Sequence, residues 1–98
     1  MPKVKTKQKI KRRRMTFALE ATAAKEVFLT GDFNNWNPQT HPMKNDGNGI
    51  WNKTVMLSPG TYEYKFLLDG NWKEDPQNYQ TCPNGFGTQN SVLNVTRR

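Results

Sequence analysis

Short runs of alternating apolar and polar side chains occupy most of the chain after residue 14. In the range 61–70, for example, Tyr62, Tyr64, Phe66 and Leu68 face one way, while Lys65 faces the opposite, accessible side. Alternation with a period of two is typical of a β-strand that buries one of its faces. Applied along the chain, the pattern predicts strands over 15–21, 26–31, 50–57, 61–70 and 91–95.

Gly, Pro and Asn residues separate these predicted strands and mark the turns between them. The segment 45–49, NDGNG, is typical of a tight hairpin because its glycines adopt a positive φ at little cost. No segment has the periodicity of a long amphipathic helix, and the one run of good helix formers, 20–26, is too short to be stable alone. Several short strands at this spacing predict an all-β sandwich, with a small β-barrel as the alternative.

The 98 residues are enough for a single domain, and their charge is distributed very unevenly. Residues 1–14 hold eight Lys or Arg and no acidic residue, whereas residues 15–98 hold seven basic and eight acidic side chains, a balance of 7 − 8 = −1. Like charges at this density repel one another. We therefore expect a basic, flexible tail over 1–14, whose last residues can extend the first strand, and a folded domain over 15–98.

The sequence favours a cytoplasmic protein that does not enter a membrane. A secretory signal requires about 7–15 consecutive apolar residues after its charges, and the polar residues within 15–26 interrupt any such run. A membrane-spanning helix requires about 20 apolar residues, which no part of the sequence supplies. Cys82 is the only cysteine, so we expect a free thiol, in agreement with a reducing compartment.

Two tryptophans lie among residues that favour turns rather than in strand alternation. Trp36 lies in the segment TGDFNNWNPQT and Trp72 in LDGNWKEDP, whereas Trp51 follows strand alternation and is predicted to be in the core. A single tryptophan beside a turn is usually a partly covered packing residue, but two in one small domain favour a binding surface. An indole covers the C–H-rich face of a sugar ring well, and nearby amides, hydroxyls or amines can bind the sugar's hydroxyl groups.

The same rings leave two other binding functions open. Indoles also stack on nucleobases, but a nucleic-acid-binding protein needs a cationic groove, and only the basic tail offers such charge. Tryptophan is also favoured in protein–protein interfaces.

An enzyme is the alternative class, and the sequence argues against it. Asp69, Glu74 and Asp75 are the available carboxylates for a glycosidase pair, but Asp69 and Asp75 are better explained as turn residues. His41, the only histidine, is predicted to be a loop residue. One His and one Cys form no metal-binding pattern, and no phosphate-binding loop is present. We therefore predict no catalytic residue, no metal site and no cofactor.

Three separated segments resemble one known family. VFLTGDFNNW (27–36), YEYKFLLDGNWKEDP (62–76) and FGTQNSVLNV (86–95) are similar, in the same order, to carbohydrate-binding module family forty-eight. That family includes the glycogen-binding domain of AMP-activated protein kinase β subunits and the N-terminal domains of isoamylases and branching enzymes. The resemblance implies an immunoglobulin-like (early-set) β-sandwich that binds glycogen, starch and other α-1,4-linked glucans without catalysis, and a possible partner enzyme or kinase in trans.

The resemblance also assigns a role to individual residues. Trp36 and Trp72 match the two tryptophans that stack on sugar rings in the family. Lys65 matches a lysine that donates hydrogen bonds to sugar hydroxyls, and Thr88 and Asn90 match polar ligand contacts. These assignments imply that residues from three separate segments converge on one site.

One further residue of the implied site departs from the family pattern. Phe86 occupies the position at which the kinase subunits carry a leucine that protrudes through the sugar helix. A flat aromatic ring is expected to stack on a sugar, whereas the leucine side chain passes through the sugar helix. The loop around this residue, 80–87, is also rich in Gly and Pro. The sequence therefore leaves open the preferred length and branching of the glucan.

Overall fold

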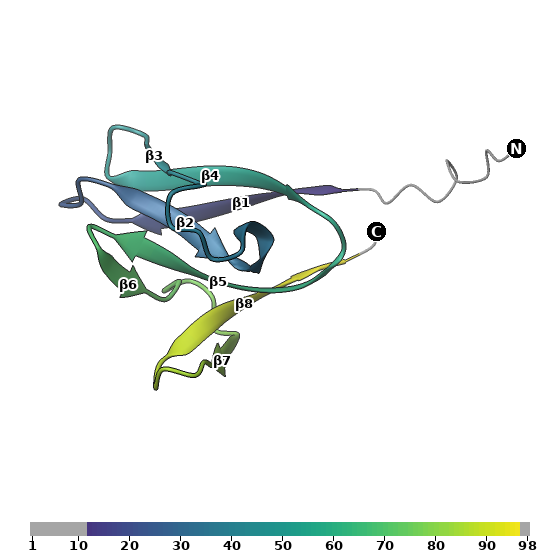
Figure 1. Cartoon of the computed structure of the whole chain (residues 1–98). Coiled ribbons are helices and arrows are strands. Elements are labelled where there is room, and N and C mark those ends of the chain that lie inside the picture. Colours follow the sequence, from purple (N-terminus) through teal and green to yellow (C-terminus); the bar gives the residue numbers. More distant parts are fainter. Residues whose placement is uncertain (1–11, 97–98) are drawn as a thin grey trace, which may run out of the picture.

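A computed structural model describes residues 12–96, which form a β-sandwich of two antiparallel sheets (Figure 1). The elements in chain order are β1 (Arg13–Glu20), β2 (Val27–Gly31), the 3₁₀ helix η1 (Asp32–Asn34), β3 (Lys44–Asn45), β4 (Ile50–Leu57), β5 (Gly60–Leu68), β6 (Asn71–Lys73), β7 (Thr81–Pro83) and β8 (Gln89–Val95). In this part of the chain, none of the helical segments has the length and apolar composition that a membrane-spanning helix needs.

The smaller sheet has the order β1-β4-β3, and the larger has the order β2-β5-β8-β7 with β6 also paired to β5. The chain crosses from one sheet to the other between β4 and β5, the wide bend at the right of Figure 1. The two sheets do not join into a closed barrel, so the prediction of a sandwich is confirmed over the barrel alternative.

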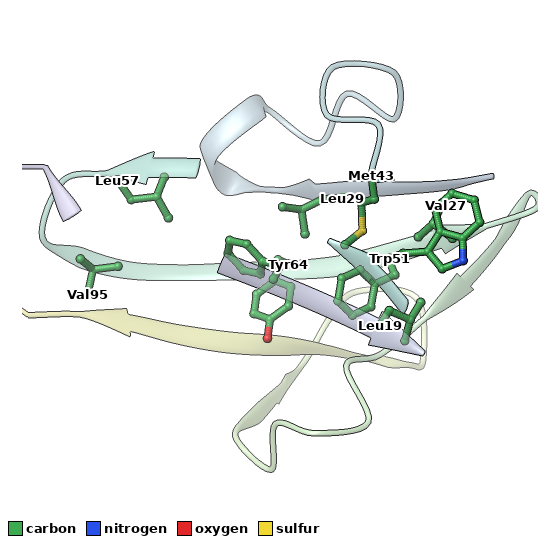
Figure 2. Close-up of a cluster of buried hydrophobic side chains, with 10 residues drawn as sticks. Leu19, Val27, Leu29, Met43, Trp51, Leu57, Tyr64 and Val95 are labelled. Carbon is green, nitrogen blue, oxygen red and sulfur yellow. The ribbon is translucent and has the colours of Figure 1, made fainter. Parts of the chain in front are cut away.

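The core lies between the sheets and contains the residues that the alternation assigned to it. Figure 2 shows Leu19, Val27 and Trp51 at one end of the core, Leu57 and Val95 at the other, and Tyr64 between them. Each of these side chains is at most 7% exposed. Burial of this apolar surface is the main source of folding free energy for a domain of this size. The prediction that Trp51 is a core residue is confirmed.

Side chains as well as glycines shape the hairpin that the NDGNG segment predicts. The Asn45 side-chain oxygen accepts hydrogen bonds from the Gly47 and Gly49 amides, at 2.8 and 3.2 Å. Both glycines have a positive φ, 95° and 86° respectively. Such Asx turns replace hydrogen bonds that the strand ladder cannot make at the bend. The tight turn that the sequence predicts is confirmed, and it places β3 beside β4.

The structure adds three short strands, β3, β6 and β7, which the sequence pattern did not predict. Each has only two or three residues, too few to show a periodicity. The first strand begins at Arg13, and Arg13 and Arg14 pair with Leu57 and Met56. Residues 1–11 lie outside the described residues, so a flexible tail over that range stays a prediction.

Candidate functional site

A cleft of about 650 Å³ opens on the outer face of the larger sheet. The side chains that line it are two indoles, one phenyl ring, one amine, one carboxylate, one hydroxyl and two amides. They belong to Trp36, Lys65, Trp72, Glu74, Asn84, Phe86, Thr88 and Asn90. All six residues of the sequence-derived site thus line the same cavity, although they come from separate parts of the chain.

The two tryptophans reach the cleft by different local structures. Trp72 lies on β6 opposite Leu67 of β5, on the face of the sheet that points away from the core, and it is 51% exposed. Trp36 follows η1 and is half-buried, with φ 58° in the left-handed region. The two ring centroids lie 6.3 Å apart, with an angle of 63° between the ring planes. The indoles therefore form one angled aromatic surface rather than a flat one.

Lys65 and Asn90 form the floor of the cleft on neighbouring strands. The Lys65 ammonium donates a hydrogen bond to the Thr88 hydroxyl at 3.1 Å, and the Asn90 side-chain nitrogen donates one to Glu63 at 3.0 Å. Each of the two floor residues is only 7% exposed. Lys65 faces away from the core as its strand position requires, but the prediction that its side chain is freely accessible is wrong, because the walls of the cleft surround it.

Asn84 organises the loop between β7 and β8. Its side-chain nitrogen donates to the Thr88 hydroxyl at 2.8 Å and to the Asn90 side-chain oxygen at 2.9 Å. Its side-chain oxygen accepts hydrogen bonds from the backbone amides of Phe86 and Thr88, at 2.9 and 3.3 Å. The loop is held by these four contacts, while the Phe86 ring itself is 90% exposed at the rim of the cleft.

Sequence reasoning did not assign two of the cleft residues, Glu74 and Asn84, to the binding site. Glu74 follows Trp72 by two residues, and no hydrogen bond or ion pair occupies its carboxylate within residues 12–96. The sequence signal that could have placed Glu74 in the site was its position close to Trp72 along the chain. Asn84 precedes a glycine, a pair typical of turns, which pointed to a loop but not to a contact with Thr88 or Asn90.

The other two carboxylates considered for catalysis serve the fold. Asp69 accepts hydrogen bonds from the Lys25 and Glu26 amides at 3.0 and 2.9 Å. Asp75 accepts one from the Gln77 amide at 2.9 Å and one from the Tyr64 hydroxyl at 2.7 Å. Burial and, to a smaller extent, the bond to Asp75 raise the pKa of Tyr64. Both aspartates are thus turn residues, as the sequence predicts.

His41 supports the loop that carries Trp36. The Asn34 side-chain nitrogen donates to His41 Nδ1 at 2.9 Å and to the Leu29 carbonyl at 3.1 Å, and its oxygen accepts from the Gly31 amide at 3.1 Å. Nδ1 is therefore an acceptor, which requires the neutral imidazole. Burial and, secondarily, the charge of Lys53 lower the pKa of His41 below its ordinary value of 6.5.

Acidification is expected to destabilise the domain through this histidine. The unfolded chain takes up a proton near pH 6.5, whereas the folded chain does so only at a lower pH, so the free energy of unfolding falls as pH drops through that window and levels off below it. Urea denaturation at several pH values between about 7.5 and 5 measures the slope, within the range where histidine titrates. Because His41 is the only histidine, His41→Gln should remove this dependence of the free energy of unfolding on pH. An unchanged slope in His41→Gln would contradict this role.

The single cysteine lies outside the set of residues that line the cleft. Cys82 is a half-buried free thiol on β7. Burial and the nearby Glu63 carboxylate raise the pKa of Cys82, so the thiol stays protonated at neutral pH. No group of three or more His, Cys, Asp or Glu side chains within residues 12–96 is placed to hold a metal ion.

Three longer proteins are similar to this chain over most of its length. Protein PTST homolog 2, chloroplastic, of Arabidopsis thaliana is 39% identical over 74 residues, which cover 76% of this chain and 13% of that protein. Protein FLOURY ENDOSPERM 6, chloroplastic, of Oryza sativa subsp. japonica is 36% identical over 83 residues, 85% of this chain and 15% of that protein. The human 5'-AMP-activated protein kinase subunit beta-2 is 33% identical over 73 residues, 74% of this chain and 26% of that subunit.

The chain thus spans about a quarter or less of the length of these relatives. The family model described as the glycogen recognition site of AMP-activated protein kinase matches residues 14–98, which include the whole cleft and, except for Arg13, both sheets. On this match, the chain belongs to the family of AMP-activated protein kinase glycogen recognition domains.

Proposed function

We propose that this chain is a noncatalytic module that binds α-1,4-linked glucans such as glycogen, starch and maltooligosaccharides in the cleft. The observation that carries the proposal is the pairing of the Trp36 and Trp72 rings, 6.3 Å apart, above a polar floor formed by Lys65 and Asn90. Rings cover the apolar faces of glucose, and the polar groups are available to its hydroxyls. Membership of a glycogen recognition family supports the same ligand.

The angle between the indoles favours a curved polymer. An α-1,4 linkage turns successive glucose units relative to one another, so the chain coils, whereas a β-1,4 chain is a flat ribbon. Two rings whose planes differ by 63° can each lie against a different unit of a coiled chain. A flat ribbon would meet only one of the two rings face to face.

The expected affinity is modest. If each indole covers about 50–100 Å² of apolar sugar surface, each contributes on the order of 1–2.5 kcal/mol. Two such contacts and a few hydrogen bonds, less the cost of ordering the ligand, correspond to a Kd between about 1 μM and 1 mM. Such a module binds a repeating polymer that presents many equivalent sites.

The composition of the cleft supports binding rather than catalysis or phosphate recognition. Glycosidases use a pair of carboxylates, and Glu74 is the only carboxylate among the cleft-lining residues of the described chain. Lys65 is likewise the only cation among these lining residues, so the charges of Lys65 and Glu74 add up to zero in the cleft. A nucleic acid would need several cations in a row.

Titration with maltoheptaose tests the proposal. Tryptophan fluorescence should change and saturate, because Trp36 and Trp72 lie in the cleft, and calorimetry should give a matching Kd. Cellohexaose, with β-1,4 linkages, is the control and should bind much more weakly. No response at millimolar maltoheptaose would contradict the proposal, and binding to oligonucleotides that weakens strongly with salt would favour the nucleic-acid alternative.

The relatives are longer than this chain, and two are named as chloroplastic proteins and one as a kinase subunit. We therefore propose that the module brings a partner enzyme or kinase to its glucan. Co-sedimentation of a candidate partner with glycogen, with and without this chain, measures that role. A partner that sediments equally well without it would contradict this part of the proposal.

A further inference from the structure

The backbone around Trp36 leaves the direction of its ring undetermined. The Trp36 amide donates to the Gly31 carbonyl at 2.9 Å, and both Asn35 and Trp36 have positive φ, 56° and 58°. A bulky residue is rarely found in the left-handed region, so the turn is held in place by its surroundings. These contacts place the Cα atom of Trp36, but its ring can still rotate about two side-chain bonds.

A single carboxylate removes that freedom. Asp32 Oδ1 accepts a hydrogen bond from the Trp36 indole N–H at 2.9 Å, and Asp32 Oδ2 accepts one from the backbone amide of Glu63 at 2.8 Å. Glu63 lies on β5, two residues before Lys65. The carboxylate therefore links the edge of the indole to the strand that supplies the floor of the cleft.

We infer that Asp32 is a positioning residue for the glucan site, which orients the Trp36 ring by holding its N–H against β5. This inference rests on the proposed function and extends it. The indole N–H already has its partner in Asp32, so Trp36 contributes its ring face to the sugar. The hydroxyl contacts are left to the polar side chains of the cleft.

The chemistry of the link requires a carboxylate. Both groups that meet the carboxylate are N–H donors, so the residue must offer two acceptors. Asparagine has the same shape but only one acceptor oxygen, and its NH₂ group would face a donor. Asp32→Asn therefore breaks one of the two contacts at almost constant volume.

The indole N–H itself gives a readout that needs no sugar. The chain has three tryptophans, so a ¹⁵N–¹H spectrum of the full chain contains three indole signals. The Trp51 N–H, which donates to the Ala21 carbonyl at 3.0 Å, is an internal reference. The Trp72 N–H has no partner within residues 12–96 and should exchange fastest with water.

In the native chain, the Trp36 N–H should exchange more slowly than that of Trp72. A hydrogen bond to a charged group corresponds to about a tenfold or larger difference in such an exchange rate. Asp32→Asn should shift the Trp36 signal and speed its exchange, and leave the Trp51 signal in place. Equal exchange of Trp36 and Trp72 in the native chain, or an unmoved Trp36 signal in Asp32→Asn, would overturn the inference.

Maltoheptaose binding then tests whether the link acts through the ring. Asp32→Asn is expected to weaken binding about 3- to 30-fold, whereas the control Asp46→Asn, which alters the distant β3–β4 turn, should leave it unchanged. Trp36→Phe keeps a ring but has no N–H, so adding Asp32→Asn to it should weaken binding less than about twofold.

If Asp32→Asn weakens maltoheptaose binding equally in the native chain and in Trp36→Phe, the inference is overturned. Asp32 would then act on the sugar or on the backbone rather than through the indole N–H. Thermal unfolding followed by circular dichroism shows whether each variant is folded. If Asp32→Asn does not fold, the exchange comparison in the native chain still decides the question. A native chain that binds no maltoheptaose would contradict the proposed function and leave the indole measurement standing.

Discussion

Trp72→Ala is expected to weaken maltoheptaose binding about 10- to 100-fold while the domain stays folded, since a central aromatic residue commonly dominates a binding site. The Trp72 ring is 51% exposed, lines the cleft and makes an edge contact with Trp36. Its removal takes away a stacking surface and the neighbour that defines the angle of the aromatic pair. Calorimetry measures the loss directly, without depending on the fluorescence of the ring that was removed.

Tyr79→Ala is the matched control. Tyr79 is also aromatic and is 96% exposed, but it lies outside the cleft. Its replacement should leave the affinity unchanged, and Trp36→Ala should resemble Trp72→Ala. A large loss of binding in Tyr79→Ala, or unfolding of Trp72→Ala, would contradict the assignment of the cleft as the binding surface.

Trp51→Ala is expected to lower the free energy of unfolding by about 3–5 kcal/mol, the usual cost of removing a buried large aromatic side chain. Trp51 is 7% exposed, packs among the core residues and donates its indole N–H to the Ala21 carbonyl. Small domains have a total stability of about 5–15 kcal/mol, so this loss leaves little or no folded protein at higher temperature. Urea denaturation measures the change.

The same substitution at two tryptophans therefore separates structure from function. Trp51→Ala should act on stability, and Trp72→Ala should change stability by less than about 1 kcal/mol, as expected for an exposed side chain. Any loss of binding in Trp51→Ala should follow the unfolded fraction. Equal destabilisation by the two substitutions would place Trp72 in the core and contradict the structure.

The sequence alone predicted the sandwich, its five longer strands and the NDGNG hairpin. These features depend on side chains that are neighbours along the chain: two-residue alternation assigns Tyr64 and Phe66 to the core and Lys65 to the opposite face. The resemblance to a known family named six site residues, and all of them line the cleft. Strands of two or three residues carry no alternation, so β3, β6 and β7 could not be predicted.

Only the tertiary structure decided how the site residues meet. The burial of Lys65 depends on walls built from β6 and the loop after β7, and the network of Asn84 depends on the return of β8 beside β7. The Asp32 link to β5 joins residues 31 positions apart. Period-two alternation is a local property that a sequence displays, whereas hydrogen bonds between distant segments depend on strand order and register, which are settled when the two sheets pack.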